Sequence, residues 1–378
     1  MTSTQGPSDP TSPTKREEAS ASSTPTITTR MILALALPSL GALIAEPLFT
    51  VIDSTMVGHL GTPQLAGLGI ASTVLNTAVG LFIFLAYSTT SLAGRHLGAG
   101  RRDLAIRSGV EAMWLAGGLG ALAAILLAVF ASPLLTWLGA DAATMPHALA
   151  YLRASAPGLV GMFVVLAATG TLRGLQDTRT PLVAASVGAA FNAVANWVLM
   201  YPLGLGVAGS GLGTAITQTL MAAFLGWMIV RAARREGVSL RPSTHGLFGA
   251  ALEGAPLLVR TIALRVALLA TLSAVTAIST QALAAHQIVW TLWSFAAYVL
   301  DALAIAAQAL AGFTTGTGER GAMRPLLRTL SRWGIGFGVA VGVALAITAP
   351  WITRIFTTDQ TVIDYATVAI IVGALFQP

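Results

Sequence analysis

The sequence has 378 residues, of which 55% are hydrophobic and 10% are charged. An ordinary soluble domain carries about 25% charged residues, so this composition excludes that class and makes a lipid bilayer the expected solvent. The formal net charge is +6, but the arginines stand mostly in short segments between apolar stretches. That pattern is typical of membrane topology and not of nucleic-acid binding. The lack of cysteine excludes disulfides, thiolate metal sites and cysteine nucleophiles.

Residues 1–29 are rich in Ser, Thr and Pro and hold few large apolar side chains, so we expect a disordered tail. Ten apolar segments follow, and all but the last are long enough to cross a hydrocarbon core of about 30 Å. Their length and the lack of alternating polarity indicate membrane-spanning helices and not barrel strands. The segments are residues 31–58, 64–92, 104–131, 146–172, 181–203, 208–234, 247–277, 282–312, 323–350 and 360–378.

The arginines indicate the orientation of these spans. Cytoplasmic loops carry an excess of Lys and Arg, and here the basic residues cluster after the second, fourth, sixth and eighth spans. The opposite side offers only Arg153 and Arg354. We therefore expect a multi-pass protein of the bacterial inner membrane, with its amino terminus and tail in the cytoplasm.

An internal repeat appears when each residue is compared with the residue 218 positions later. Leu92-Ala93-Gly94 then matches Leu310-Ala311-Gly312, and Gly98 matches Gly316. Corresponding spans run in the same direction, which predicts parallel repeats about an axis along the membrane normal. The expected fold is an all-α polytopic bundle of two six-helix lobes, residues 30–247 and 248–378. About ten of twelve helices are present, so we expect the second lobe to be truncated.

An acid inside a membrane span is a candidate functional residue, because a charge at the bilayer centre costs about 2.5–3.5 kcal/mol. Asp53 in the first span is the best candidate, and Glu46 lies two turns before it. Pro47 between them removes a backbone hydrogen bond, so the helix can bend there. A carboxylate whose burial changes with conformation suits proton coupling. The alternative is that Asp53 lies near the outer membrane surface, solvated or ion-paired.

Other polar residues within spans are candidates for the substrate or ion cavity. Asn192 and Asn196 share one face of the fifth span because they are four residues apart; they could bind a cation or water chain, or join neighbouring helices. The seventh and eighth spans hold four more candidates: Arg260, Arg265, Asp301 and Gln308. We expect the charged ones either to form a structural ion pair between the two helices or to contact the substrate.

No nucleophile with a base, no metal-ligand cluster and no phosphate loop occurs in a suitable context, so the sequence predicts neither an enzyme nor a cofactor. Gly204 to Gly209 match the spacing of a dinucleotide-binding loop, but they join two apolar helices and lack a preceding strand. Gly209, Gly211 and Gly213 are better explained by close helix packing.

Three motifs resemble the multidrug and toxic compound extrusion (MATE) family, DinF branch, over residues 30–378. The first runs from Asp53 to Gly61 and continues with Leu65-Ala66-Gly67, the second is the loop from Leu172 to Pro181, and the third runs from Leu283 to Ile288. The resemblance implies twelve helices in two lobes around a cavity that faces either side alternately. It further implies export of cationic or amphipathic compounds in exchange for protons or sodium, by a monomer in contact with membrane lipid.

The resemblance also implies that Asp53 is the coupling acid, with Asn192 and Asn196 as its partners on the fifth helix. Members often carry a second aspartate where this chain has Asn196, and an amide cannot take up a proton, so Asp53 would act without a second acid. The acids of the sodium-linked branch are not recognisable, which favours protons. Two rival functions remain open: a lipid-linked sugar flippase of the same superfamily, favoured by Arg260 and Arg265, and an inactive truncated fragment.

Overall fold

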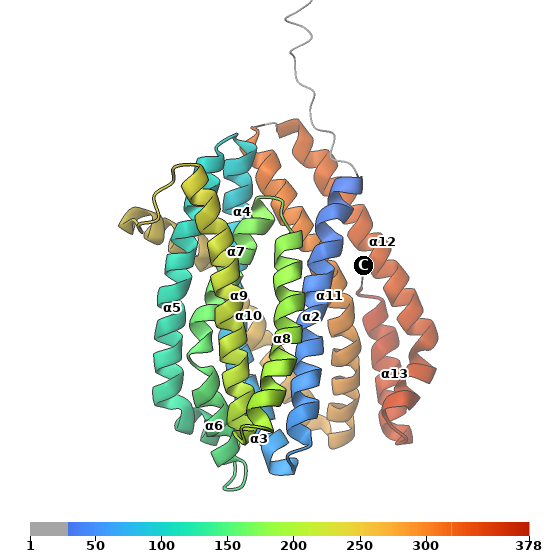
Figure 1. Ribbon diagram of the computed structural model, residues 1–378. Helices are drawn as coiled ribbons and strands as arrows, with labels where there is room; N and C mark the ends of the chain where they lie inside the picture. The colour runs from blue at the N-terminus through green and yellow to red at the C-terminus, as the bar shows by residue number, and fades with distance from the viewer. Residues whose placement is uncertain (1–28, 319, 378) are drawn as a thin grey trace, which may run out of the picture.

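The structure is a computed structural model that describes residues 29–318 and 320–377. Within them the chain forms only helices, joined by short turns, and no strand (Figure 1). The predicted tail, residues 1–28, lies outside the described residues. The helices are α2 (Thr29–Gly58), α3 (Thr62–Leu81), α4 (Phe84–Gly98), α5 (Arg102–Trp137), α6 (Met145–Ser155), α7 (Gly158–Gly174), α8 (Arg179–Met200), α9 (Gly206–Arg235), α10 (Thr244–Ile278), α11 (Thr280–Gly316), α12 (Arg320–Phe356) and α13 (Gln360–Ala374).

All ten predicted apolar segments are helical. Eight spans are long and apolar enough to cross a membrane, α3 and α4 forming one of them, while α6 and α7 add a ninth that is bent by 52°. The final apolar segment forms the shorter helix α13. The chain is therefore a multi-pass membrane protein with an all-α fold, as its hydropathy predicts.

The arginine-rich turns lie at one end of the bundle. In Figure 1 the start of α2 and the connections α4–α5, α7–α8, α9–α10 and α11–α12 are all at the top. The connections without arginine, such as α2–α3 and α8–α9, are at the bottom. Arg153 is in the last turn of α6 and Arg354 in the last turn of α12. The bundle therefore has one strongly basic end, which is the asymmetry expected of a membrane protein with a fixed orientation.

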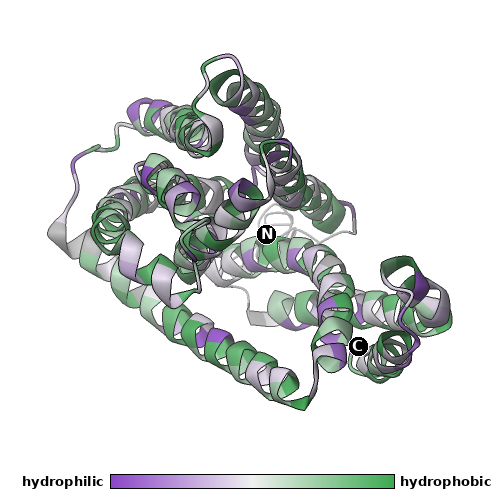
Figure 2. Cartoon of the chain, turned by 90° about the horizontal axis from the view of Figure 1, so that it is seen from below, coloured by the Kyte–Doolittle hydropathy of each residue, from purple (hydrophilic) through white to green (hydrophobic). Residues whose placement is uncertain are grey.

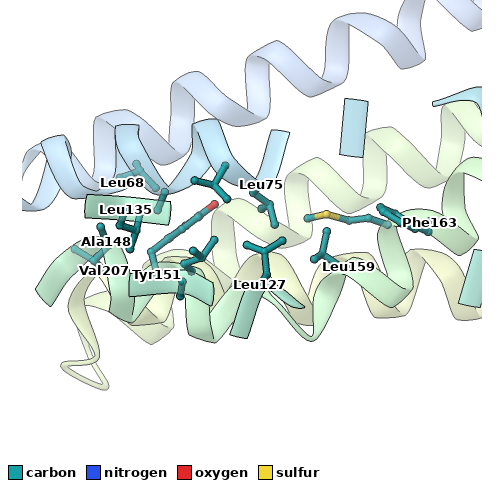
Figure 3. Packing of buried hydrophobic residues seen from close by; sticks show 14 of the residues in the cluster. Leu68, Leu75, Leu127, Leu135, Ala148, Tyr151, Leu159, Phe163 and Val207 are labelled. Carbon is teal, nitrogen blue, oxygen red and sulfur yellow. The ribbon is translucent and has the colours of Figure 1, made fainter. Parts of the chain in front are cut away.

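Apolar side chains cover the outside of the helices as well as the interior (Figure 2). In the interior, α3, α5, α6, α7 and α9 share a cluster that includes Leu68, Leu135, Tyr151, Phe163 and Val207 (Figure 3). Because lipid tails are as apolar as leucine, such a cluster holds helices together by close packing and not by escape from water. The close packing of interior side chains therefore contributes more to the association of these helices than the total apolar area that they bury.

The repeated motif forms the contact between α4 and α11. The boundaries of the α3–α4 span, 62 and 98, recur in α11 at 280 and 316, a shift of 218 residues. At this contact Gly94 and Gly98 face α11, while Gly312 and Gly316 face α4. A Cβ added to Gly312 would lie 2.7 Å from the backbone oxygen of Ser91. The equivalent glycines of the two repeats thus let the backbones of α4 and α11 touch.

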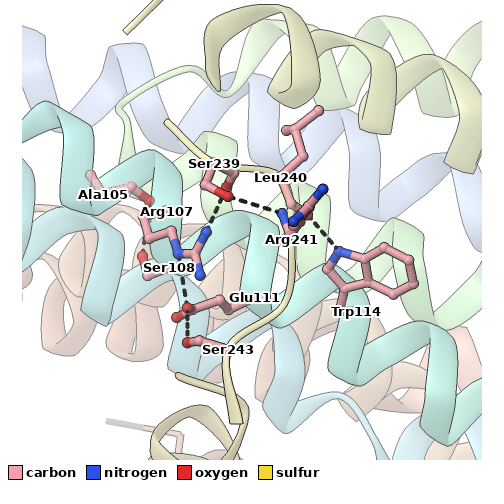
Figure 4. A network of polar contacts seen from close by, with 9 residues as sticks. All are labelled: Ala105, Arg107, Ser108, Glu111, Trp114, Ser239, Leu240, Arg241 and Ser243. Carbon is pink, nitrogen blue, oxygen red and sulfur yellow. Dashed lines mark hydrogen bonds and ion pairs between the residues drawn. The ribbon is translucent and has the colours of Figure 1, made fainter. Parts of the chain in front are cut away.

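Polar contacts hold the connection between α9 and α10, residues 236–243, against α5 (Figure 4). Arg107 of α5 donates from Nε to Glu111 at 2.9 Å and from Nη1 to the carbonyl of Ser239 at 2.6 Å. The hydroxyl of Ser243 donates to the same Glu111 carboxylate at 2.6 Å. The segment that leads into α10 is therefore fixed to α5 along most of its length.

The glycine contact yields a stability prediction. Gly312→Ala should destabilise the protein by about 1–3 kcal/mol, because the added methyl group meets the backbone of α4 and the helices must move apart. Gly334→Ala in α12 is the matched control, since a Cβ there meets no atom within 4 Å. Thermal unfolding of the purified proteins in detergent measures both. Equal melting temperatures for the two variants would contradict the assigned α4–α11 contact.

Candidate functional site

A cavity of about 280 Å³ lies inside the bundle, and α2, α3, α4, α6, α7, α8, α9 and α11 contribute to its wall. Most of the lining side chains are apolar. Among the side chains that the structure describes, three charged ones also line it: Asp53 from α2, Arg173 from α7 and Asp301 from α11. A mainly apolar cavity with a few polar groups is the usual form of a small-molecule binding site.

Asp53 forms the polar centre of one end of this cavity. Its carboxylate is 5% exposed and accepts two hydrogen bonds at Oδ1, from Asn196 Nδ2 at 3.0 Å and from Ser210 Oγ at 2.5 Å. These partners come from α8 and α9, so the acid joins three helices. Across the described residues no basic side chain lies within 4 Å of it. The carboxylate is therefore bound by neutral donors only.

The two asparagines extend the network away from the acid. Asn196 also donates from Nδ2 to Asn192 Oδ1 at 2.9 Å, and Asn192 donates to Thr217 Oγ1 at 3.4 Å. Both asparagines are buried. Asn196 Oδ1 is buried without a hydrogen-bond partner within the described part of the chain. It is a free acceptor on the residue that already binds Asp53.

Glycines of α9 make room for this network, as their spacing predicts. A Cβ on Gly213 would overlap the side-chain oxygen of Asn196, and one on Gly209 would lie 2.7 Å from the backbone of Leu199. Gly211 likewise approaches the backbone of α6, where a Cβ would lie 2.5 Å from the carbonyl oxygen of Tyr151. The close approach of α9 to α6 and α8 brings Ser210 within reach of the carboxylate.

A second charged group lies at the other end of the cavity. Tyr87 of α4 interacts electrostatically with Asp301 of α11. Arg173, in the last turn of α7, interacts electrostatically with both. Arg260 of α10 also acts on Asp301 electrostatically. Helices of the two repeats therefore meet here through charge as well as through glycines.

The structure separates the predicted cavity residues into two groups. Asp53, Asn192 and Asn196 are brought together, and the burial of Asp53 excludes the solvated, ion-paired alternative. Asp301 also lines the cavity. The side chain of Glu46, within α2, lies outside what the structure describes.

The remaining three predicted residues do not line the cavity: Arg260, Arg265 and Gln308. Both arginines are exposed on α10, and in the described part of the chain neither forms an ion pair with Asp301 within 4 Å. Arg260 does act on Asp301 electrostatically, so a pairing of the α10 arginines with Asp301 stays a prediction. Gln308 keeps a buried Oε1 without a partner.

Sequence reasoning missed Ser210, Tyr87 and the cavity position of Arg173. Ser210 stands between packing glycines, so it reads as another small residue of that stripe. Arg173 was used only for topology, because it stands at the end of an apolar segment. In the described residues no three His, Asp or Glu side chains gather at metal-binding distance.

Comparison with known proteins supports the resemblance found in the sequence. The chain is 32% identical to protein DETOXIFICATION 44, chloroplastic, of Arabidopsis thaliana, over 89% of this chain and 66% of that protein. It is 29% identical to DNA damage-inducible protein F (DinF) of Escherichia coli, over 79% of this chain and 66% of that protein. It thus spans slightly less than two thirds of the length of either relative.

A solved structure of a MATE in the bent conformation has the same fold, with a TM-score of 0.84, 21% identity and coverage of 92% of this chain and 78% of that one. The MatE family model matches residues 38–198 and 256–378, and the DinF relative supports the DinF-type assignment. The chain therefore belongs to the MatE family.

Proposed function

We propose that this protein is a secondary active exporter of amphipathic organic cations, and that Asp53 couples export to proton uptake. One observation carries the proposal: a buried carboxylate on the wall of an apolar cavity is held only by neutral hydrogen-bond donors. An ionised carboxylate without a nearby cation is costly in a membrane interior. Binding either a proton or a cationic compound removes that cost.

Exchange follows if the proton and the cationic compound use the same acid. A carboxylate that carries a proton no longer attracts a cation, so proton uptake would favour release of the compound. Asn196 supports both forms of Asp53: its Nδ2 donates to the ionised carboxylate, and its free Oδ1 could accept from the protonated one. The Asn196 amide can therefore act as a hydrogen-bond partner of Asp53 in both protonation states without carrying a charge.

Protons are favoured over sodium by the chemistry of the partners. Sodium is a hard cation that needs several oxygen ligands, whereas Asp53 Oδ1 receives two hydrogen-bond donors, an amide nitrogen and a hydroxyl. Movement of Asp53 between the two sides would use bending of α2 at Pro47, a residue that removes one backbone hydrogen bond of this helix. The name of the Arabidopsis relative, which states detoxification, agrees with export.

The lipid-linked sugar flippase has less support. The argument for a flippase was that Arg260 and Arg265 would make the cavity cationic, but neither residue lines the cavity. The charged lining within the described residues consists of two acids, Asp53 and Asp301, and one base, Arg173. An apolar cavity of this composition fits an amphipathic cation better than a sugar phosphate.

The proposed orientation places the basic end of the bundle in the cytoplasm of a bacterial cell, and the proposed boundary between the two lobes lies near residue 247. Since the chain has no cysteine, single cysteines can test the orientation. Arg235→Cys, at the basic end, should resist a membrane-impermeant maleimide in intact cells and react after lysis. Ala142→Cys, an exposed residue of the opposite end, should react in both. The reverse labelling pattern would show that the orientation is inverted.

Replacing the coupling acid tests the transport proposal. Asp53→Asn keeps the shape and hydrogen bonding of the side chain but cannot exchange a proton, so efflux of ethidium driven by a pH gradient in vesicles should fall to the background of protein-free vesicles. Asp364→Asn, which changes an exposed acid of α13, is the control and should keep normal efflux. Normal efflux by Asp53→Asn would remove this carboxylate from the mechanism.

The role of Asn196 can be tested by stability. Asn196→Leu should lower the free energy of unfolding by about 1–3 kcal/mol, because a buried carboxylate loses one of its two donors. If that loss arises at Asp53, it should shrink when Asn196→Leu is combined with Asp53→Asn, in a double-mutant cycle. Chemical unfolding in detergent gives the four values. An equal loss in both backgrounds would show that Asn196 acts only through packing.

A further inference from the structure

Arg173 is a buried arginine with one guanidinium nitrogen, Nε, that forms no hydrogen bond within the described part of the chain. The side chain is 8% exposed and lines the cavity, and its Nε is buried without a partner. The ion pairs of the described residues, Arg102 with Glu236 and Arg107 with Glu111, do not include it. A buried polar group without a partner is rare in proteins and calls for an explanation.

Among the described residues, Asp301 is the acid that acts on this arginine electrostatically, but the two side chains form no ion pair within 4 Å. Arg260 acts on the same carboxylate. In the part of the chain that the structure describes, Asp301 is therefore shared between Arg173 and Arg260, and Arg173 keeps a buried Nε–H that is available to an anionic group.

Arg173 and Asp53 stand at opposite ends of the cavity. The helices α2 and α7 run in opposite directions, and each residue lies near the end of its helix (Figure 1). Residues 42–54 of α2 line the cavity, which corresponds to about 18 Å at 1.5 Å per residue. Between the two charges the wall is mainly apolar. The cavity thus has one acidic end, one basic end and an apolar middle.

We propose that Arg173 is an anion-binding subsite, and that the compound carried by this protein has a carboxylate or another anionic group in addition to its cationic group. This inference rests on the proposed function, because it assigns the second half of the substrate whose cationic half contacts Asp53. Arginine binds carboxylates and phosphates through paired donors in a fixed plane, so a guanidinium with an unused Nε–H suits this task. Asp301 then competes with the ligand for Arg173.

Two dyes that differ in one charge form a suitable probe pair. Rhodamine 110 has a cationic ring system and a free carboxylate, whereas rhodamine 123 is its methyl ester and keeps only the cation. Fluorescence anisotropy with the purified 378-residue chain in detergent gives the affinity for each dye. The informative quantity is the ratio of the two affinities, because general damage to the cavity weakens both dyes and leaves the ratio unchanged.

Arg173→Gln should lower the preference for rhodamine 110 over rhodamine 123 by about tenfold, the loss typical of a charge-assisted hydrogen bond. Asp301→Asn should change the ratio in the opposite direction, because the competing carboxylate is gone. A misfolded variant would not produce that opposite sign. Arg179→Gln removes an exposed arginine at the same end of the bundle and is the control that should leave the ratio unchanged.

Three outcomes would overturn the inference. Unchanged affinities for both dyes in Arg173→Gln would show that no anionic group is bound there, and an equal loss of affinity for both dyes would assign Arg173 a structural role. In either case the proposed function stands if Asp53→Asn weakens both dyes. Failure of both dyes to bind the unmodified protein would overturn the proposed function together with the inference.

Discussion

Close contact between helix backbones is the constraint on which the rest of this structure depends. Lipid offers no hydrophobic gain for pairing helices, so they associate where small residues let them interlock. Gly94 and Gly312 provide such a contact between α4 and α11, and Gly211 provides one between α9 and α6. The polar network around Asp53 needs this packing, because a side chain at Gly213 would displace Asn196. Packing glycines and functional residues are therefore parts of one arrangement.

The same constraint explains why a charged residue is tolerated inside the bundle. Asp53 is held by donors from two other helices, and each donor is neutral. A basic partner would have made a permanent ion pair and left the carboxylate unable to exchange its bound cation. Neutral donors stabilise the position of the acid without fixing its charge. The site is thus stable enough to fold and still open to a proton or a cationic ligand.

The sequence predicted the helices well and the orientation of their faces only in part. Long apolar segments identify spans regardless of packing, whereas the break at Phe82 and Ile83 lies within uninterrupted apolar sequence and leaves no signal. The spacing of Asn192 and Asn196 placed them on one face of their helix. Their pairing with Asp53 came from the family resemblance. Arg260 and Arg265 were predicted as cavity residues but do not line the cavity, because hydropathy does not show which helices border it. Contacts across helices, such as that of Ser210, require the fold.

The charged residues that line the cavity come from both repeats. Asp53 on α2 and Arg173 on α7 come from the first repeat, while Asp301 is supplied by α11 of the second. Any shift of α11 against α4 and α7 therefore changes how strongly Asp301 competes for Arg173. A ligand can bias a conformational change only if it binds one state more tightly than the other. If Arg173 binds an anionic group as proposed, that group would bind most tightly in a state in which α11 has moved Asp301 away, and substrate binding would then favour movement between the repeats.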